Sequence, residues 1–218
     1  MSHARAGSPR PARADIGCAV DAGRRVALVL FLLVWALVAL STGRYHVRGD
    51  AQQMCGAAAS IWDHGWIDVP SGRDDRYFGR DGRYYTKYPL GNTLQCAPGL
   101  SLQAAGRILG GDDSSTQFLL AGIVPALWTA LLALGFFVLG RELGFSARVA
   151  AFGALLLVFA SPIWAYGREM YSENSQALAL TWTLWAYVRA MRTGARRHFL
   201  LGGLLVGLCI HQKTPLAV

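Results

Sequence analysis

The sequence predicts an all-α membrane protein with about five transmembrane helices and one large loop between the first two. Of the 218 residues, 53% are hydrophobic and only 16% are charged. The apolar residues also form blocks, at 26–42, 117–139, 149–166, 175–191 and 199–210, and lack the periodic spacing of a soluble core. The first four blocks approach or exceed the roughly 20 residues that cross a bilayer as helix. The fifth is shorter and is followed by polar residues, so it is interpreted as a span that is about to leave the membrane.

The basic residues between these blocks predict the orientation, because Lys and Arg of short loops stay on the cytoplasmic side. They precede the first block, separate the second from the third, and separate the fourth from the fifth: Arg5, Arg10, Arg13, Arg24, Arg25, Arg141, Arg148, Arg189, Arg192, Arg196 and Arg197. We therefore expect residues 1–25 to be a disordered cytoplasmic tail. The large loop 43–116 and the turn 167–174 then share the extracytoplasmic face.

The net charge of +8 is mostly a topology signal, so a nucleic-acid partner is not implied. An uncleaved first helix is favoured over a signal peptide, because the apolar run is long and no clear small-x-small site follows it. The cysteines show no metal-type spacing. Cys55 and Cys96 share the outer loop, where they either form a disulfide or remain two unrelated thiols.

A first candidate site follows the first span. Apolar residues recur at helical spacing over 51–64, which predicts a short helix lying in the membrane interface, and Asp50 stands directly before it. Asp50 is interpreted either as the N-cap of that helix, accepting its free N–H groups, or as a catalytic carboxylate at the water–lipid boundary.

Aromatic and basic residues dominate the next part of the loop. Aromatic pairs flank Asp81 and Gly82, a pattern that predicts a short β-hairpin. Pro89 then favours the start of a helix over 89–109, interrupted by Pro98 and Gly99 and expected to be interfacial or re-entrant. Lys87, between the two, either belongs to a solvated basic rim facing anionic lipid or grips a phosphate.

A second acidic site lies between the third and fourth blocks, at Glu173. Its structural interpretation is a carboxylate that complements the dipole of the following helix. Its functional interpretation is a second carboxylate on the same face as Asp50, and the predicted topology supports that face.

The order of these features resembles the GT-C glycosyltransferases. The resemblance covers roughly residues 26–218 and is carried by Gly49-Asp50, by DGRYYTKYPLG at 81–91, by SPIW at 161–164 and by YSE at 171–173. Within that superfamily the chain is most similar to the bacterial membrane proteins of the family 39 type, grouped with protein O-mannosyltransferases and the aminoarabinose transferase of lipid A. Those relatives often carry an acidic residue directly after the aspartate, where this chain has Ala51.

The resemblance implies a membrane enzyme that moves a sugar from a polyprenyl-phosphate donor to a lipid, glycan or protein acceptor, outside the bacterial inner membrane and with inversion. It implies Asp50 and Glu173 as catalytic carboxylates. It assigns the donor to the basic and aromatic residues Arg83, Tyr85, Lys87, Tyr88 and Lys213. No cofactor is certain, and a divalent metal is left open.

Two other functions compete with the glycosyltransferase hypothesis. A transporter or flippase of a lipid-linked glycan would bind the head group and would need no catalytic base. Such proteins place ionisable groups near the membrane midplane, whereas the spans expected here carry almost no charged residues. A non-catalytic membrane scaffold would tolerate loss of Asp50. The GT-C-like domain, 26–218, is also expected to be truncated at its C-terminus, because relatives have more spans.

Overall fold

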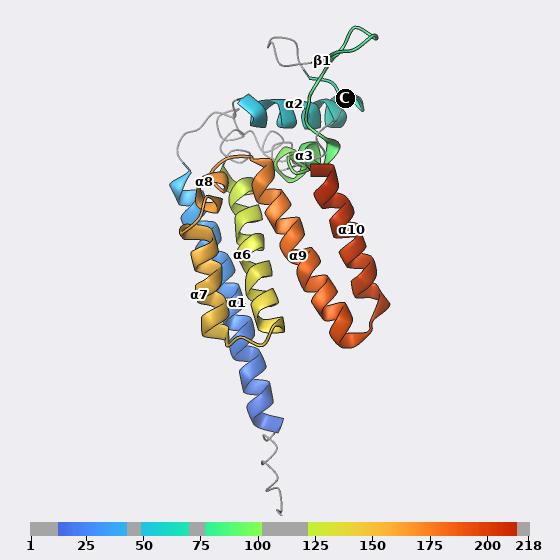
Figure 1. Cartoon of the computed structure of the whole chain (residues 1–218). Helices are drawn as coiled ribbons and strands as arrows, with labels where there is room; N and C mark the ends of the chain where they lie inside the picture. Colours follow the sequence, from blue (N-terminus) through green and yellow to red (C-terminus); the bar gives the residue numbers. More distant parts are fainter. Residues whose placement is uncertain (1–12, 43–48, 70–76, 102–121, 213–218) are drawn as a thin grey trace, which may run out of the picture.

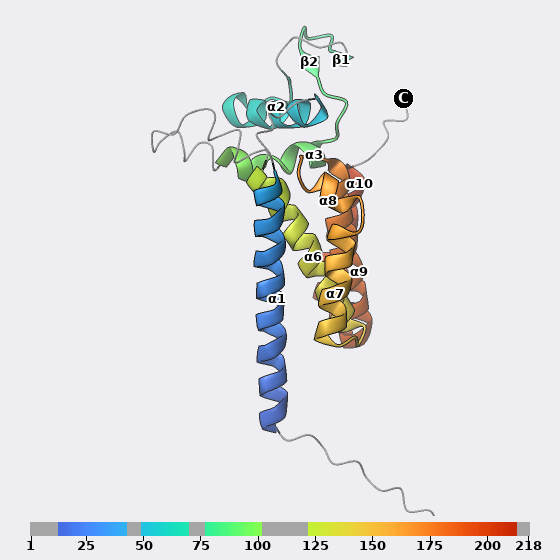
Figure 2. The same cartoon turned by 90° about the vertical axis from the view of Figure 1, so that its left-hand side faces the viewer.

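The structure is a computed structural model that describes residues 13–42, 49–69, 77–101 and 122–212. In this part of the chain a bundle is formed by α1 (Arg13–Ser41), α6 (Val124–Glu142), α7 (Ala147–Phe159), α9 (Ser172–Thr193) and α10 (Arg196–Gln212) (Figure 1). The short helix α8 (Ile163–Tyr166) follows α7. One end of the bundle is covered by α2 (Gly49–His64), which lies across it, together with β1 (Tyr77–Phe78), β2 (Tyr84–Tyr85) and α3 (Leu90–Leu94) (Figure 2).

Among the described helices, two are long and apolar enough to cross a membrane: 21–41 within α1, and α6. Helix α7 is apolar but has 13 residues, and α10 has 17. Helix α9 has 22 residues, but it starts with a polar stretch and carries Arg189 and Arg192 near its end. The five expected spans therefore correspond to five helices, of which only two have both the length and the composition of a span.

The expected third span, 149–166, is not a continuous helix. Helix α7 ends at Phe159, and α8 starts afresh at Ile163 after Pro162. The proline ring disfavours helical backbone at the residue before it, and proline has no N–H to continue the ladder. The hydroxyl of Ser161 instead accepts a hydrogen bond from the Ile163 N–H at 3.2 Å.

Helix α1 begins earlier than the expected 1–25 tail allows. Residues 13–25 of the expected tail are helical and lead directly into the apolar span. The segment is rich in alanine and arginine, which are strong helix formers, and an apolar helix follows that can propagate backwards. Residues 1–12 lie outside the described part of the chain.

The bundle core is built from a narrow stripe of α1 and from small residues on its neighbours. Leu30, Val34 and Val38 recur every four residues on α1 and are buried, while much of the rest of the helix exposes leucine. Ala130 of α6 and Ala154 of α7 are fully buried in the same cluster. Small side chains let helices approach closely, which is how membrane helices pack without a hydrophobic driving force between them. The exposed apolar faces are then suited to lipid.

Helix α6 accommodates a large side chain of α9 at Gly135. A Cβ atom at Gly135 would lie 2.7 Å from Nε1 of Trp182, so only glycine leaves room for the indole. The same indole N–H donates to the carbonyl of Leu131 at 3.2 Å. This contact satisfies the indole N–H of a half-buried tryptophan and fixes α9 along α6.

The helix expected over 89–109 is broken earlier than predicted. Helix α3 starts after Pro89 but ends at Leu94, and helical residues resume only at 97–101. The break falls at Gln95 and Cys96, not at Pro98, because proline is well accommodated in the first turn of the second segment, where its missing N–H costs nothing. Residues 102–109 lie outside the described part.

The two short strands pair antiparallel, with Phe78 opposite Tyr84. Gly82, in the turn between them, has φ +79°, a conformation that glycine adopts without strain. The N–H of Val69 donates to the Tyr84 carbonyl at 2.9 Å, so the pair is also attached to the segment that follows α2.

Candidate active site at the α2 end of the bundle

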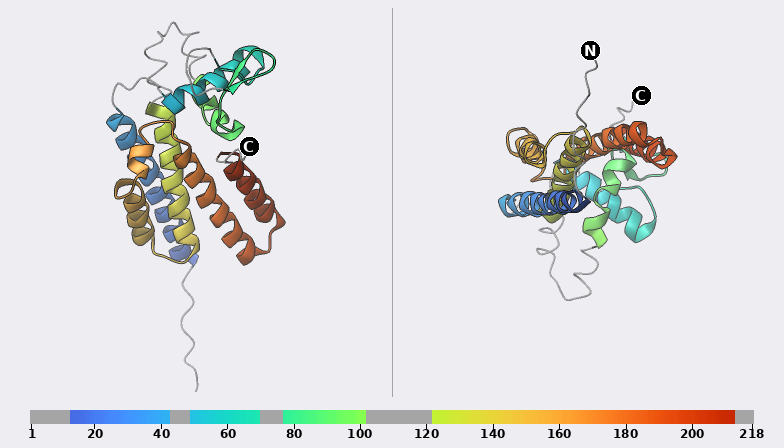
Figure 3. Two further views of the ribbon diagram at one scale, coloured as in Figure 1. Left: turned by 45° about the horizontal axis from the view of Figure 1, so that its top comes forward. Right: turned by 90° about the horizontal axis from the view of Figure 1, so that it is seen from below.

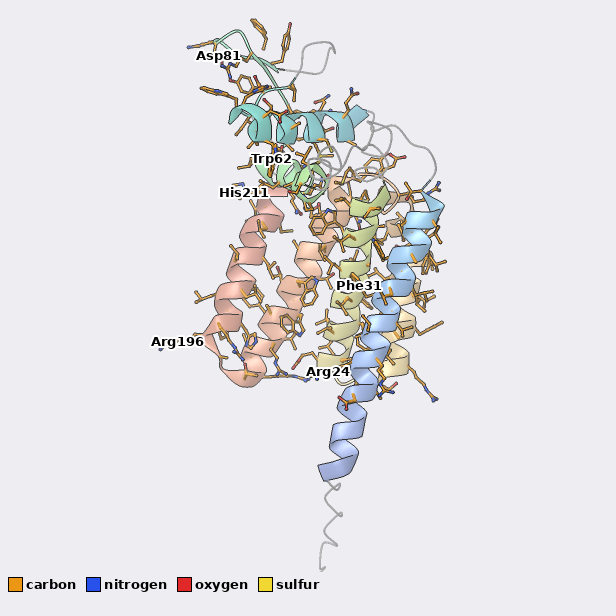
Figure 4. The ribbon with its side chains drawn as sticks, turned by 180° about the vertical axis from the view of Figure 1, so that it is seen from behind. Arg24, Phe31, Trp62, Asp81, Arg196 and His211 are labelled. Carbon is orange, nitrogen blue, oxygen red and sulfur yellow. The ribbon has the colours of Figure 1, made fainter. Side chains whose placement is uncertain are left out.

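The bundle has two chemically different ends. We call the end covered by α2, α3 and the hairpin the α2 end, and the end holding the α6–α7 and α9–α10 connections the arginine end. Arg24 and Arg196 mark the arginine end, whereas Trp62, Asp81 and His211 lie at the α2 end (Figure 4). All the described candidate site residues belong to the α2 end or to the elements that begin or finish there.

A buried cluster, which we call the roof cluster, joins the elements of the α2 end. Met54, Cys55 and Ala58 of α2 pack against residues from the 96–101 segment, the start of α6 and the turn before α9: Cys96, Leu100, Val124 and Met170. Burial of this apolar surface holds α2 against the bundle. The start of α9, which carries Glu173, is thereby tied to the helix that carries Asp50.

Asp50 lies in the first turn of α2. The helix begins at Gly49, so Asp50 is its second residue and not the N-cap expected from the sequence. A carboxylate in the first turn still interacts favourably with the helix dipole, so the physical basis of the expectation is unchanged. The structure describes the backbone of Asp50 and not its side chain.

A polar contact connects α2 to the strand that leads to Lys87. Gln53, less than one turn after Asp50, is 5% exposed, and its Oε1 accepts from the Thr86 hydroxyl at 3.4 Å. That hydroxyl in turn accepts from the Tyr88 N–H at 3.2 Å. The start of α2 and the backbone on both sides of Lys87 are therefore held together.

Lys87 is exposed at this junction. Its Nζ lies 5.2 Å from the ring centroid of Tyr88, within the range of a cation–π contact. The Tyr88 ring packs in turn against the roof cluster. An exposed lysine beside a ring that packs on the roof cluster can hold a phosphate group.

Glu173 lies in the first turn of α9, where its Oε2 accepts from the Ser172 hydroxyl at 3.1 Å. The next residue, Asn174, anchors this turn: its Nδ2 donates to the Thr129 hydroxyl at 2.8 Å, and both residues are buried. Thr129 also donates to the Pro125 carbonyl at 2.9 Å. Helix α6 therefore fixes the position of the turn that carries Glu173.

Arg83 and Tyr85 are engaged within the hairpin region. The Arg83 guanidinium lies 4.1 Å from the Trp66 ring centroid and 3.7 and 3.9 Å from the carboxylates of Asp68 and Asp81. The Tyr85 hydroxyl donates to Asp81 at 2.5 Å. This bond lowers the pKa of Asp81, aided by the Arg83 N–H and opposed by partial desolvation, and raises the pKa of Tyr85.

Lys213 lies outside the described residues, directly after the end of α10. That end packs against α3, which lies between α2 and α10 (Figure 3). A Cβ at Gly91 of α3 would lie 2.8 Å from the His211 carbonyl oxygen, so the two backbones meet only because residue 91 is glycine.

Sequence reasoning did not single out several polar residues of this region. Gln53 and Asn174 organise the site, and Asn92, Thr93 and Gln95 of the α3 region are buried. Gln53 and Asn174 stand next to or within one turn of the predicted carboxylates, a signal that was available in the sequence. The burial of α3 could not be inferred, because it depends on α2 and α10. Within the described residues no group of three His, Cys, Asp or Glu side chains could hold a metal ion.

Taken with the two apolar helices, this architecture defines a membrane protein whose polar site lies at one end of a helix bundle. A comparison with known families matches residues 103–218, slightly more than half of the chain, to the dolichyl-phosphate-mannose-protein mannosyltransferases. The chain belongs to this family, and it is an integral membrane protein of the GT-C glycosyltransferase type. Searches of curated proteins and of solved structures find no match.

The matched region contains α6 to α10, with Glu173 and Lys213, and excludes α2 and the hairpin. Asp50 and Lys87 therefore lie outside the matched region. Their roles depend on the resemblance of the loop motifs and on the contacts of the α2 end.

Proposed function

We propose that this chain transfers a sugar from a polyprenyl-phosphate donor to an acceptor on the extracytoplasmic face, with inversion at the anomeric carbon. The observation that supports this most directly is the convergence of three elements at the α2 end: the start of α2, the Thr86–Tyr88 segment and the start of α9. A carboxylate and a cation are the two groups that such a transfer needs.

The distribution of arginine supports the proposed sidedness. Arg141, Arg148, Arg189, Arg192, Arg196 and Arg197 all belong to the two connections at the arginine end or to the helix turns beside them. Basic residues of short loops stay on the cytoplasmic side. The α2 end would then face outward, where an acceptor hydroxyl and the head of a lipid-linked donor can meet.

The proposed reaction is a single displacement. Asp50 accepts the proton of the acceptor hydroxyl as its oxygen bonds to the anomeric carbon. The bond from that carbon to the phosphate oxygen breaks on the opposite face, which inverts the centre. The polyprenyl phosphate leaves as an anion, so no general acid is required, and Lys87 stabilises the developing charge.

The remaining candidates support this chemistry. Glu173 would orient the acceptor or raise the basicity of Asp50 by like-charge repulsion. Tyr88 would hold Lys87 in place, and Lys213 would add a second cation for the phosphate from the end of α10. Arg83 and Tyr85 would contribute by shaping the hairpin, because they pair with Asp68 and Asp81, which lie in or beside it.

The test is a transfer assay with the full-length gene product in membrane vesicles and a panel of polyprenyl-phosphate sugars. We expect Asp50→Asn to lower the turnover by about 10²–10⁴-fold, the usual contribution of a general base. The matched control is Asp63→Asn, at the exposed far end of the same helix, which should transfer at the wild-type rate. Equal rates for Asp50→Asn and wild type would refute the proposed base, and donor translocation without transfer would favour a flippase.

A further inference from the structure

Two cysteines from different elements meet inside the α2 end. Cys55 lies on α2 and Cys96 lies between α3 and the 97–101 helical segment, 41 positions further along the chain. Their Sγ atoms are 2.6 Å apart in a hydrogen-bonded pair, and the residues are 7% and 0% exposed. The pair is thus buried within the roof cluster, through which α2 packs on the bundle.

The surroundings argue against a reactive or metal-binding pair. Both sulfurs belong to the roof cluster, whose other members are apolar. The shared hydrogen bond and burial raise the pKa of the Cys96 thiol strongly, so the thiolate that would act as nucleophile or metal ligand is disfavoured. No third ligand-type side chain of the described residues completes a metal group around the pair. A structural cross-link is the chemistry that remains.

We infer that Cys55 and Cys96 form a structural disulfide that cross-links α2 to the segment following α3. The inference rests on the sidedness of the proposed function, because disulfides persist in oxidising extracytoplasmic compartments. Two thiols lose two protons and two electrons as one S–S bond forms. The electron acceptor is a protein disulfide of the exchange-oxidant class, which is reduced to a dithiol.

The order of events follows from burial. Once the roof cluster has closed, both sulfurs are buried and formation of the Cys96 thiolate, which exchange needs, is disfavoured. Oxidation therefore takes place while the outer loop is folding, before α2 docks. The bond closes a loop that contains the hairpin and Lys87, and one of its cysteines lies on α2, which carries Asp50 in its first turn. It would limit the separation of the proposed base from the proposed phosphate-binding cation, which the Gln53–Thr86 hydrogen bond alone holds only weakly.

Thiol counting tests this inference. Cells expressing the full-length protein are treated with N-ethylmaleimide. The protein is then denatured and alkylated again without reductant, and its proteolytic peptides are analysed by mass spectrometry. The sequence to Val218 contains four cysteines. We expect peptides with Cys18 and Cys209 to be labelled and those with Cys55 and Cys96 to be labelled only after reduction. Labelling of all four without reductant would overturn the inference.

Single variants provide matched controls. Cys55→Ser should make Cys96 reactive in the denatured protein, whereas Cys209→Ser, on α10, should leave the pair protected. Reduction should lower the unfolding temperature of wild type and leave that of a Cys55→Ala/Cys96→Ala double variant unchanged. Equal sensitivity of both proteins to reductant would contradict a structural staple.

Failure here is distinguishable from failure of the proposed function, because labelling needs no sugar donor. A reduced pair in a protein that transfers sugar in an Asp50-dependent way would refute the disulfide alone.

Discussion

The two ends of the helix bundle use polar groups differently. At the arginine end, Glu142 pairs with Arg189 at 3.1 Å and with Arg192 at 3.6 Å, which links α6 to α9 through a carboxylate side chain that is 11% exposed and two arginines that are about half exposed. At the α2 end, buried oxygens of several residues make no hydrogen bond within the described part of the chain: Asn92, Thr93, Gln95, Asn174 and Gln212.

The two ends therefore have different roles: the charged residues of the arginine end mark the orientation in the membrane, and the buried polar residues of the α2 end are candidates for binding a ligand. Charges that are paired at a surface contribute modestly to stability and mark the cytoplasmic side of a membrane protein. Buried polar atoms without a partner are costly, and their presence in a folded protein calls for an explanation such as a ligand or water. Substitutions at the α2 end should therefore alter activity, and those at the arginine end should alter little beyond stability.

Among the candidate residues whose side chains the structure describes, the largest effect is expected at Lys87. Lys87→Ala should lower sugar transfer by roughly 10²-fold, because a donor to the developing phosphate charge is lost. Arg80→Ala removes another exposed cation of the same loop and is the matched control. Initial rates at saturating donor measure both. A loss in Arg80→Ala as large as that in Lys87→Ala would show that the loop needs only general positive charge.

A smaller effect is expected at Asn174. Asn174→Ala removes the bond to Thr129 and opens space beside a buried hydroxyl, so it should destabilise the protein by about 1–3 kcal/mol. Thr193→Ala, at the exposed opposite end of α9, should cost much less. Thermal unfolding of the purified protein in detergent compares them. Unchanged stability in Asn174→Ala would mean that α6 does not anchor the turn carrying Glu173.

At the arginine end, Glu142→Gln should cost about 1 kcal/mol, because the two arginine partners are about half exposed and solvent screens their charge, although the Glu142 side chain itself is 11% exposed. The difference from wild type should shrink as salt is added, because exposed charges are screened. Sugar transfer should be unchanged. A large loss of transfer in this variant would contradict the division of roles between the two ends.

The smallest effect concerns pH and the hairpin. Because the pKa of Asp81 is lowered from 3.8 on folding, its contribution is complete above that value and is lost as pH falls through the folded pKa. Because the pKa of Tyr85 is raised from 10.0, its contribution is complete below that value and is lost as pH rises through the folded pKa. Tyr85→Phe should return the pKa of Asp81 toward its ordinary value, measured by carbon-13 NMR of labelled aspartate. An unchanged Asp81 pKa would rule out the hydrogen bond.

The amino-acid sequence alone determined the class of the protein, since lipid solvation acts on local composition. Each expected apolar block contains helix, although 149–166 is divided between α7 and α8, and the basic residues of the short connections share one end of the bundle. The family resemblance could likewise be stated from local motifs, and the family match over 103–218 supports it. Local patterns were less reliable where proline and polar residues compete, as at Pro162 and at Gln95-Cys96.

Only the tertiary structure decided which residues meet. The contacts of Gln53 with Thr86, of Asn174 with Thr129 and of Cys55 with Cys96 join positions 33 to 45 residues apart. No periodicity carries such information, because these contacts arise when apolar surfaces from separate elements are buried together. The sequence left the cysteine pair open between a disulfide and two unrelated thiols, and the packing of α2 on the bundle brings the two sulfurs into contact.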